Sequence, residues 1–194
     1  MITLSLLLAS IDIASAGTRK PNIVFILTDD LGYGDVSLLN KDSKVQTPHI
    51  DGLAKVGVYL TDAHSPSAIC SPSRYSILTG HYAWRNPRLM RGIVRPWGPS
   101  TIKDGDSTIP AYLGKAGYST ACIGKWHLGF DWPFAKGYHA DNTRKGGNSV
   151  ANPSMFDFTQ AIKGGPLGAG FQHYFGVDCP NFPPYTFIND DKLV

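Results

Sequence analysis

A continuous apolar run that stops at two adjacent acids is the strongest constraint on how this chain folds. Residues 22–27 read Asn-Ile-Val-Phe-Ile-Leu, without the polar alternation of a half-exposed strand. Such a run is typical of a strand buried on both faces of a parallel sheet. It ends at Asp29 and Asp30, and ligands of open α/β sheets bind at the carboxyl ends of strands. The sequence therefore predicts an α/β domain with a site near these carboxylates.

A short helix is predicted to begin beside Cys70, where the chain reads Cys-Ser-Pro-Ser-Arg-Tyr-Ser-Ile-Leu-Thr-Gly. Ser71 suits the N-cap, Pro72 the first helical position, and Gly80 the left-handed residue that ends a helix. Backbone N–H groups at this end of a helix attract anions, and Arg74, one turn on, can fold back to add a planar cation. The alternative interpretation is a buried structural thiol.

Helical and strand patterns alternate along the chain. Residues 47–57 place apolar residues on one helical face, and a second strand is expected at residues 58–61. Residues 111–117 form a short helical pattern closed by a glycine, and residues 118–124 read as a third strand. This order favours a layered α/β architecture.

A Lys-x-His pattern follows the third predicted strand, in the segment Gly-Lys-Trp-His-Leu-Gly. Alternation along an extended segment would send Lys125 and His127 to one side, toward the pocket. Lys125 can hold an anion as a point charge, and His127 can donate a hydrogen bond or shuttle a proton. A lysine on a surface turn is the alternative interpretation of Lys125.

These three motifs together resemble the type I sulfatases, and the later part of the chain is similar to bacterial arylsulfatase-like enzymes. The resemblance implies an alkaline-phosphatase-like α/β fold, a mostly parallel sheet flanked by helices. It also implies that a formylglycine-generating enzyme oxidises Cys70 to formylglycine. One hydroxyl of the hydrated aldehyde would then attack the sulfur of a sulfate ester, and the other would later expel sulfate.

The resemblance also assigns a divalent metal to the site. It implies that Asp29, Asp30 and the modified Cys70 are ligands of that ion. Hard oxygen ligands favour Ca²⁺, with Mg²⁺ as the alternative. The family's second ligand pair, an Asp-Asn, is not found in the sequence, and residues 189–191 (Asn-Asp-Asp) are a poor substitute because of their position.

The remaining site residues are also implied by the resemblance. Arg74, Lys125 and His127 would stabilise the diol and the charge that develops on the substrate, with Lys125 contacting the sulfate. Some relatives place a serine in the loop after Gly176, where this chain has Asn181, which could supply the corresponding hydrogen bond to sulfate.

The expected function is hydrolysis of a sulfate ester of a small molecule or carbohydrate, with no nucleic acid as partner. Two alternatives remain: a phosphoester or phosphonate hydrolase of the same superfamily, and a non-catalytic anion-binding remnant. The resemblance covers residues 20–194, no more than the first half of a typical member. Residues 17–194 are therefore expected to be the incomplete N-terminal part of the catalytic domain and inactive alone.

Residues 1–16 resemble a signal peptide, because an apolar run precedes Ala-Ser-Ala before Gly17. Export to the periplasm or the exterior is the expectation. Removing them discards one acid, Asp12, and changes the formal charge from +3 to +4, which suits anionic substrates. No later run reaches the roughly 18 apolar residues of a membrane span.

Cysteines and arginines leave two questions open. Cys122 and Cys179 could form a disulfide, or Cys122 could be a core residue. The arginine-rich loop that follows the predicted helix contains either exposed surface arginines or side chains that face the substrate. Its arginines are Arg85, Arg88, Arg91 and Arg95.

Overall fold

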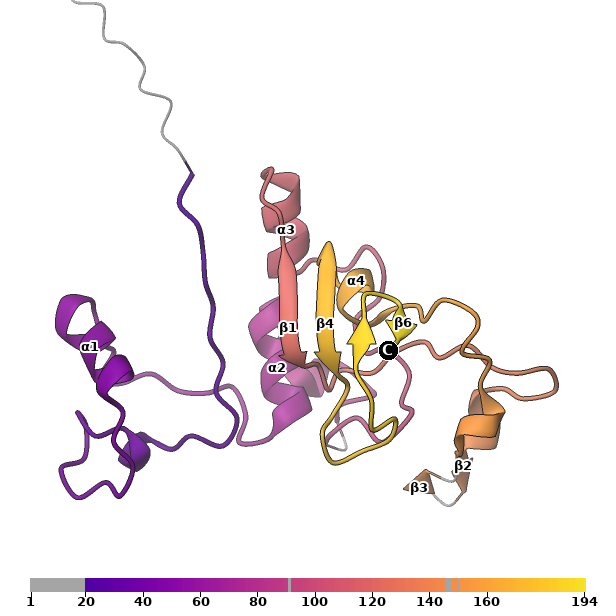
Figure 1. The fold of residues 1–194 in the computed structure, drawn as a ribbon, viewed down its shortest axis with the longest axis horizontal. Helices are drawn as coiled ribbons and strands as arrows, with labels where there is room; N and C mark the ends of the chain where they lie inside the picture. The colour runs from indigo at the N-terminus through magenta and orange to yellow at the C-terminus, as the bar shows by residue number, and fades with distance from the viewer. Residues whose placement is uncertain (1–19, 91, 146–147, 150) are drawn as a thin grey trace, which may run out of the picture. The chain divides into compact units, whose positions relative to one another are not determined.

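The structure, a computed structural model, describes residues 20–90, 92–145, 148–149 and 151–194. The predicted signal peptide, residues 1–16, lies outside the described residues. The chain divides into two compact units, Met1–Val58 and Tyr59–Val194, each with its own elements (Figure 1).

The first unit contains the helix that the sequence predicted. A 3₁₀ helix, η1 (Tyr33–Asp35), precedes α1 (Pro48–Val56). In the first turn of α1 the Asp51 carboxylate accepts hydrogen bonds from the hydroxyls of Ser37 and Thr47, each at 2.8 Å. The helix start is thereby fixed to the preceding loop.

The strand predicted at residues 22–27 is not formed. The structure assigns no regular element there, and the side chains from Ile23 to Leu27 are exposed. Residues 58–61 likewise form no strand. An apolar run records a preference for burial, whereas a strand also needs a neighbour to complete its hydrogen bonds. No ladder among the described residues includes either segment.

The second unit is built around a four-stranded sheet in the order β1-β4-β5-β6. Its centre is the parallel pair of β1 (Ala121–Lys125) and β4 (His173–Val177), side by side in Figure 1. Two short antiparallel strands follow, β5 (Ile188–Asn189) and β6 (Lys192–Leu193). The third strand predicted from the sequence is thus confirmed, although it begins at Ala121 rather than at residue 118.

A close approach of two glycines sets the packing of the parallel pair. Gly124 and Gly176 are partners in the register. A Cβ added to Gly176 would lie 1.9 Å from the Gly124 carbonyl oxygen, so no larger residue fits there. The pairing of the two strands therefore requires glycine at position 176.

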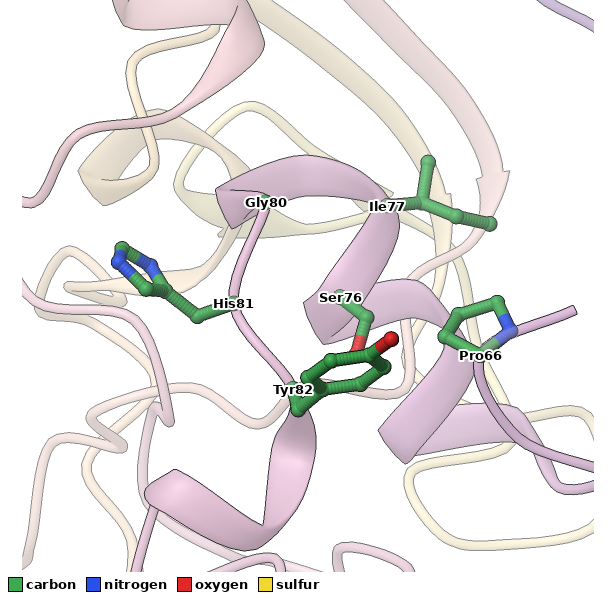
Figure 2. Close-up of a pocket in the computed structure, with 6 residues that line it drawn as sticks. All are labelled: Pro66, Ser76, Ile77, Gly80, His81 and Tyr82. Carbon is green, nitrogen blue, oxygen red and sulfur yellow. The ribbon is translucent and has the colours of Figure 1, made fainter.

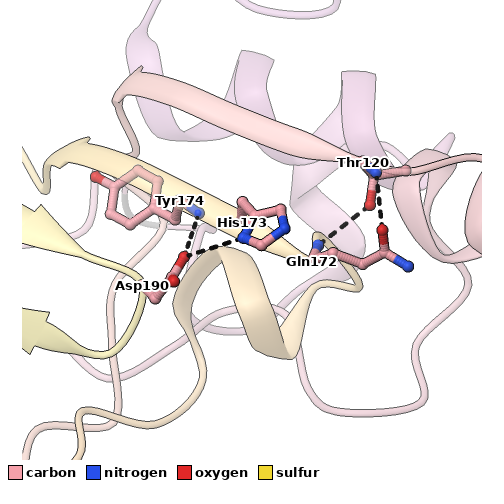
Figure 3. A network of polar contacts seen from close by, with 5 residues as sticks. All are labelled: Thr120, Gln172, His173, Tyr174 and Asp190. Atoms are coloured by element: carbon pink, nitrogen blue, oxygen red, sulfur yellow. Dashed lines mark hydrogen bonds and ion pairs between the residues drawn. The ribbon is translucent and has the colours of Figure 1, made fainter.

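Hydrogen bonds from side chains hold the other end of the same strands (Figure 3). The backbone N–H of Thr120 donates to the Gln172 side chain, and the backbone N–H of Gln172 donates to the Thr120 hydroxyl, both at 3.2 Å. Asp190 accepts from the backbone N–H of Tyr174 at 2.8 Å and lies 3.9 Å from His173. These contacts link β1 to β4, and β4 to the turn between β5 and β6.

Two helices accompany the sheet, as predicted. Helix α2 (Cys70–Thr79) ends at Gly80, which takes the expected left-handed conformation with φ 70°. Thr108 is the N-cap of helix α3 (Ile109–Lys115), and its hydroxyl accepts a hydrogen bond from the backbone N–H of Ala111. The remaining short elements of this unit are η2 (Ala83–Arg85), η3 (Ala140–Thr143), β2 (Arg144–Lys145), β3 (Asn148–Ser149), η4 (Pro153–Met155) and α4 (Gly165–Gly168).

The sheet has one buried and one open face. Tyr174 belongs to an aromatic-rich core on the buried face, and Cys122 packs against that core. On the other face, the register partners Ile123 and Phe175 are 74% and 43% exposed, and Phe187 stacks on Phe175. A sheet flanked by helices confirms the predicted α/β class.

Candidate active site

Cys70 is the first residue of α2, and the residue before it, Ile69, is the N-cap. The prediction that Ser71 caps the helix is therefore wrong. Ser71 is fully buried inside the first turn, and its hydroxyl accepts a hydrogen bond of 3.0 Å from the backbone N–H of Val94. The hydroxyl satisfies a buried donor from a distant loop, a role that helix patterns do not reveal.

Lys125 reaches Cys70 from the carboxyl end of β1. Its Nζ lies 3.4 Å from the Cys70 Sγ, within hydrogen-bonding distance of a sulfur atom. The motif at the start of α2 and the Lys-x-His motif are thus brought together, as the sequence predicted. The Lys125 cation therefore lies beside the Cys70 side chain.

Arg74 binds the main chain of the same lysine. Its Nη1 donates to the Lys125 carbonyl oxygen at 2.6 Å. A charged donor to a part-buried carbonyl makes a strong hydrogen bond. Arg74 thereby ties α2 to the end of β1 and fixes the backbone from which the Lys125 side chain extends.

His127 is buried and contacts a backbone carbonyl. Its Nε2 lies 3.1 Å from the Val94 carbonyl oxygen. Because a carbonyl only accepts hydrogen bonds, Nε2 carries the hydrogen in this contact. The φ of His127 is 53°, so the extended alternation used to place it on the same side as Lys125 does not continue to this residue.

Asp178 is a buried acid that the sequence analysis missed. It directly follows β4, and its carbonyl oxygen accepts from the backbone N–H of His127 at 2.7 Å. Its side chain is 1% exposed, and neither carboxylate oxygen has a hydrogen bond of normal geometry among the described residues. Burial raises the pKa of the Asp178 carboxyl to about 7, opposed by the backbone N–H groups of His127 and Gly129. An acid immediately after a strand was the available signal.

The two predicted metal ligands of the first unit, Asp29 and Asp30, are exposed. Their carboxylates suit a hard cation, but Ca²⁺ takes about six to eight oxygen ligands. No group of three or more His, Cys, Asp or Glu residues that could hold a metal occurs in the described parts of the chain. The described residues therefore supply part of a ligand set at most.

Asn181 lies in the turn after β4. The backbone N–H of Phe182 donates to the Cys179 carbonyl oxygen at 3.0 Å and closes this turn, on which Asn181 is exposed. Its side chain is accessible to a ligand.

All three cysteines are free thiols, so the disulfide considered between Cys122 and Cys179 is not formed. Cys122 packs against the core, which agrees with the alternative interpretation. Burial raises the pKa of the Cys122 thiol to about 11, although the charge of Arg74 acts in the opposite direction.

A cavity of about 280 Å³ lies at the other end of α2 (Figure 2). Its walls are largely apolar, and none of the predicted site residues contributes to them. The lining residues are Pro66, Ser76, Ile77, Gly80, His81 and Tyr82.

None of the helices in the described residues combines the length and the apolar character needed to cross a membrane.

Comparison with known proteins gives consistent matches. A family model described as Sulfatase matches residues 21–186. N-acetylgalactosamine-6-O-sulfatase of Bacteroides thetaiotaomicron is 46% identical over 112 residues, covering 58% of this chain and 21% of that protein. Arylsulfatase J of Mus musculus is 40% identical over 181 residues, covering 92% of this chain and 26% of that protein.

A solved structure described under glycosaminoglycan metabolism by Bacteroides thetaiotaomicron superposes with a TM-score of 0.72 at 35% identity. The match covers 91% of this chain and 32% of that structure. The likeness confirms the alkaline-phosphatase-like fold expected from the sequence. The chain spans between about a fifth and a third of the length of these three proteins.

Proposed function

This chain belongs to the sulfatase family, and from that premise we propose that it forms part of an enzyme that hydrolyses sulfate esters with a formylglycine derived from Cys70. The observation that carries the proposal is the 3.4 Å contact between Lys125 Nζ and Cys70 Sγ. The contact brings a cation to the Cys70 side chain, at the N-terminus of helix α2, where backbone N–H groups favour anions.

The Sγ atom of Cys70 marks the approximate position of the hydroxyl oxygens of the hydrated aldehyde. Attack by one hydroxyl forms an oxygen–sulfur bond while the bond between sulfur and the ester oxygen breaks, and the proton of the attacking hydroxyl leaves with the released alcohol. Loss of the proton from the second hydroxyl then expels sulfate and restores the aldehyde. Lys125 would offset negative charge on the attacking oxygen and on the sulfate.

Arg74 and His127 would assist Lys125 and the hydrated aldehyde at residue 70. Arg74 orients Lys125 through its backbone carbonyl and adds positive charge near the diol. The Nε2 of His127 is held by the Val94 carbonyl, so we assign proton transfer with the diol to Nδ1. Asn181 would donate a hydrogen bond to the sulfate.

Asp29 and Asp30 would supply two oxygen ligands of a divalent cation, Ca²⁺ or alternatively Mg²⁺. Adjacent carboxylates repel each other, and a cation relieves that repulsion. When bound, the ion would polarise a sulfate oxygen. The modified residue 70 would be a third ligand.

The partners follow from the same assignment. The formylglycine-generating enzyme would read the sequence around Cys70, and the substrate would be a sulfated small molecule or carbohydrate. We also propose export, supported by the apolar run and Ala-Ser-Ala in residues 1–16. N-terminal sequencing of the exported protein should then begin at Gly17.

The test of function joins this chain to the downstream part of the Bacteroides N-acetylgalactosamine-6-O-sulfatase. The chimaera is produced with a formylglycine-generating enzyme and assayed on an aryl sulfate and the matching aryl phosphate, with Cys70→Ala as the control. Turnover of the sulfate that Cys70→Ala abolishes supports the proposal. Preference for the phosphate would favour the phosphoester hydrolase, and anion binding without turnover would favour the non-catalytic alternative. The 194-residue chain alone should show no turnover, because it supplies too few metal ligands.

A further inference from the structure

The loop of residues 92–98 is fixed at one end between two site residues. Val94 is buried. Its backbone N–H donates to the hydroxyl of Ser71, the neighbour of Cys70, at 3.0 Å, and its carbonyl oxygen lies 3.1 Å from His127 Nε2. The backbone of residue 94 is therefore bonded to a neighbour of Cys70 and to His127.

A buried tryptophan fixes the other end of this loop. Trp97 has a φ of 59°, a costly conformation for a bulky side chain, and is buried. Its ring stacks on Phe156 with a centroid distance of 4.4 Å and meets Trp132 edge-on at 5.0 Å. The backbone N–H of Gly98 closes the turn on the Arg95 carbonyl at 2.9 Å. The loop is thus held rigidly by the packing around Trp97.

Arg95 lies between these two anchors and is exposed. Two other arginines of this unit have structural partners: Arg74 binds the Lys125 carbonyl, and Arg88 binds the Ser100 carbonyl at 2.5 Å. Within the described residues the Arg95 side chain makes no hydrogen bond or ion pair. Nothing in this part of the fold therefore requires an arginine at position 95.

We propose that Arg95 determines substrate specificity by binding a second anionic group of the substrate, on a sugar next to the one that carries the reacting sulfate ester. The proposal rests on the proposed function. A guanidinium can pair bidentately with two oxygens of either a carboxylate or a sulfate. Because the backbone on both sides of Arg95 is already ordered, little further entropy is lost when such a group binds.

The test uses the active chimaera and four substrates. These are an aryl sulfate, a disaccharide with one sulfate and no other charge, the same disaccharide with a neighbouring carboxylate, and the same disaccharide with a second sulfate. Arg95→Ala should lower kcat/KM roughly tenfold or more on the substrates with a second anion, mainly through KM. Arg95→Ala should leave kcat/KM unchanged on the aryl sulfate and on the disaccharide with a single sulfate. Arg95→Lys should recover part of the loss on the other two substrates.

Arg85→Ala is the matched control, since Arg85 is also an exposed arginine of this unit that makes no side-chain hydrogen bond or ion pair among the described residues. An equal loss on all four substrates, or no loss on any, overturns the proposal. A loss confined to the carboxylate or to the second sulfate supports it and identifies the group that is bound.

A binding measurement separates this inference from the activity. Calorimetry on the 194-residue chain with the carboxylate-bearing and doubly sulfated disaccharides compares wild type, Arg95→Ala and Arg85→Ala. If the chimaera turns over no sulfate ester, the proposed function fails, and binding alone decides the role of Arg95. If Arg95→Ala binds more weakly and Arg85→Ala binds like wild type, the role of Arg95 is supported. Equal binding by all three proteins, or no binding by wild type, overturns it.

Discussion

The side-chain nitrogen of Lys125 lies 3.4 Å from the Cys70 sulfur, although 55 residues separate them in the chain. In the active chimaera, Lys125→Ala should lower kcat on an aryl sulfate by about 10²–10³, the usual loss for one donor to developing negative charge. Steady-state kinetics on protein with a measured formylglycine content checks this. Lys115→Ala, an exposed lysine of α3, is the control and should retain activity. A Lys125→Ala enzyme as fast as wild type would remove the lysine from the proposed mechanism.

Ser71 should contribute to stability through its hydroxyl. Ser71→Ala leaves the N–H of Val94 without its buried acceptor, so the free energy of unfolding should fall by about 1–3 kcal/mol. Urea denaturation of the 194-residue chain measures the change. Ser119→Ala, at an exposed serine, should change stability by less than about 0.5 kcal/mol. Equal effects of the two substitutions would show that the bond to Val94 adds little.

The Asp178 carboxyl should make stability depend on pH. Its pKa is raised by burial from 3.8 to about 7, so the folded state binds its proton more tightly than the unfolded state. Its stabilising contribution is fully present below about pH 4 and is lost as the pH rises through about 7, a change of about 4 kcal/mol.

Asp178→Asn removes this titration. Urea denaturation of both proteins at pH 5 and pH 8 should show that the variant gains stability relative to wild type at the higher pH. Parallel pH profiles for the two proteins would show that the Asp178 carboxyl is not buried in solution.

The acidic pair should confer a response to calcium. In the chimaera, Ca²⁺ should raise the Tm, because an ion that binds only the folded protein stabilises it. Replacing Asp29 and Asp30 together by Asn should abolish that rise, whereas Asp42→Asn, at an exposed acid of the same unit, should keep it. An unchanged calcium response in the double variant would exclude the pair as ligands.

Local patterns predicted where the helices lie. Gly80 takes the predicted left-handed conformation that ends α2, because this signal depends on a few neighbouring residues, whereas Ser71, the predicted cap, lies inside the helix. The run from residue 22 to 27 failed as a strand, since strand pairing depends on a distant partner.

The candidate site was predicted in the same uneven way. The motifs placed Cys70 and Lys125 at one site, and the structure has their side chains in contact. The position of Asp178 after a strand was a usable signal, but neither its burial nor the contact of Ser71 with Val94 could be predicted, because both arise from packing between segments that are far apart in the sequence. The left-handed φ of His127 also broke the alternation on which its expected direction depended.

Whether Cys70 becomes the catalytic formylglycine can be measured by mass spectrometry of the peptide that contains residue 70. The 194-residue chain is produced in cells that contain a formylglycine-generating enzyme, with Cys122 and Cys179 as internal references. We expect an aldehyde or its hydrate at position 70 and unmodified thiols at the other two positions. An unmodified thiol at position 70 in all of the protein would exclude Cys70 as the source of the nucleophile.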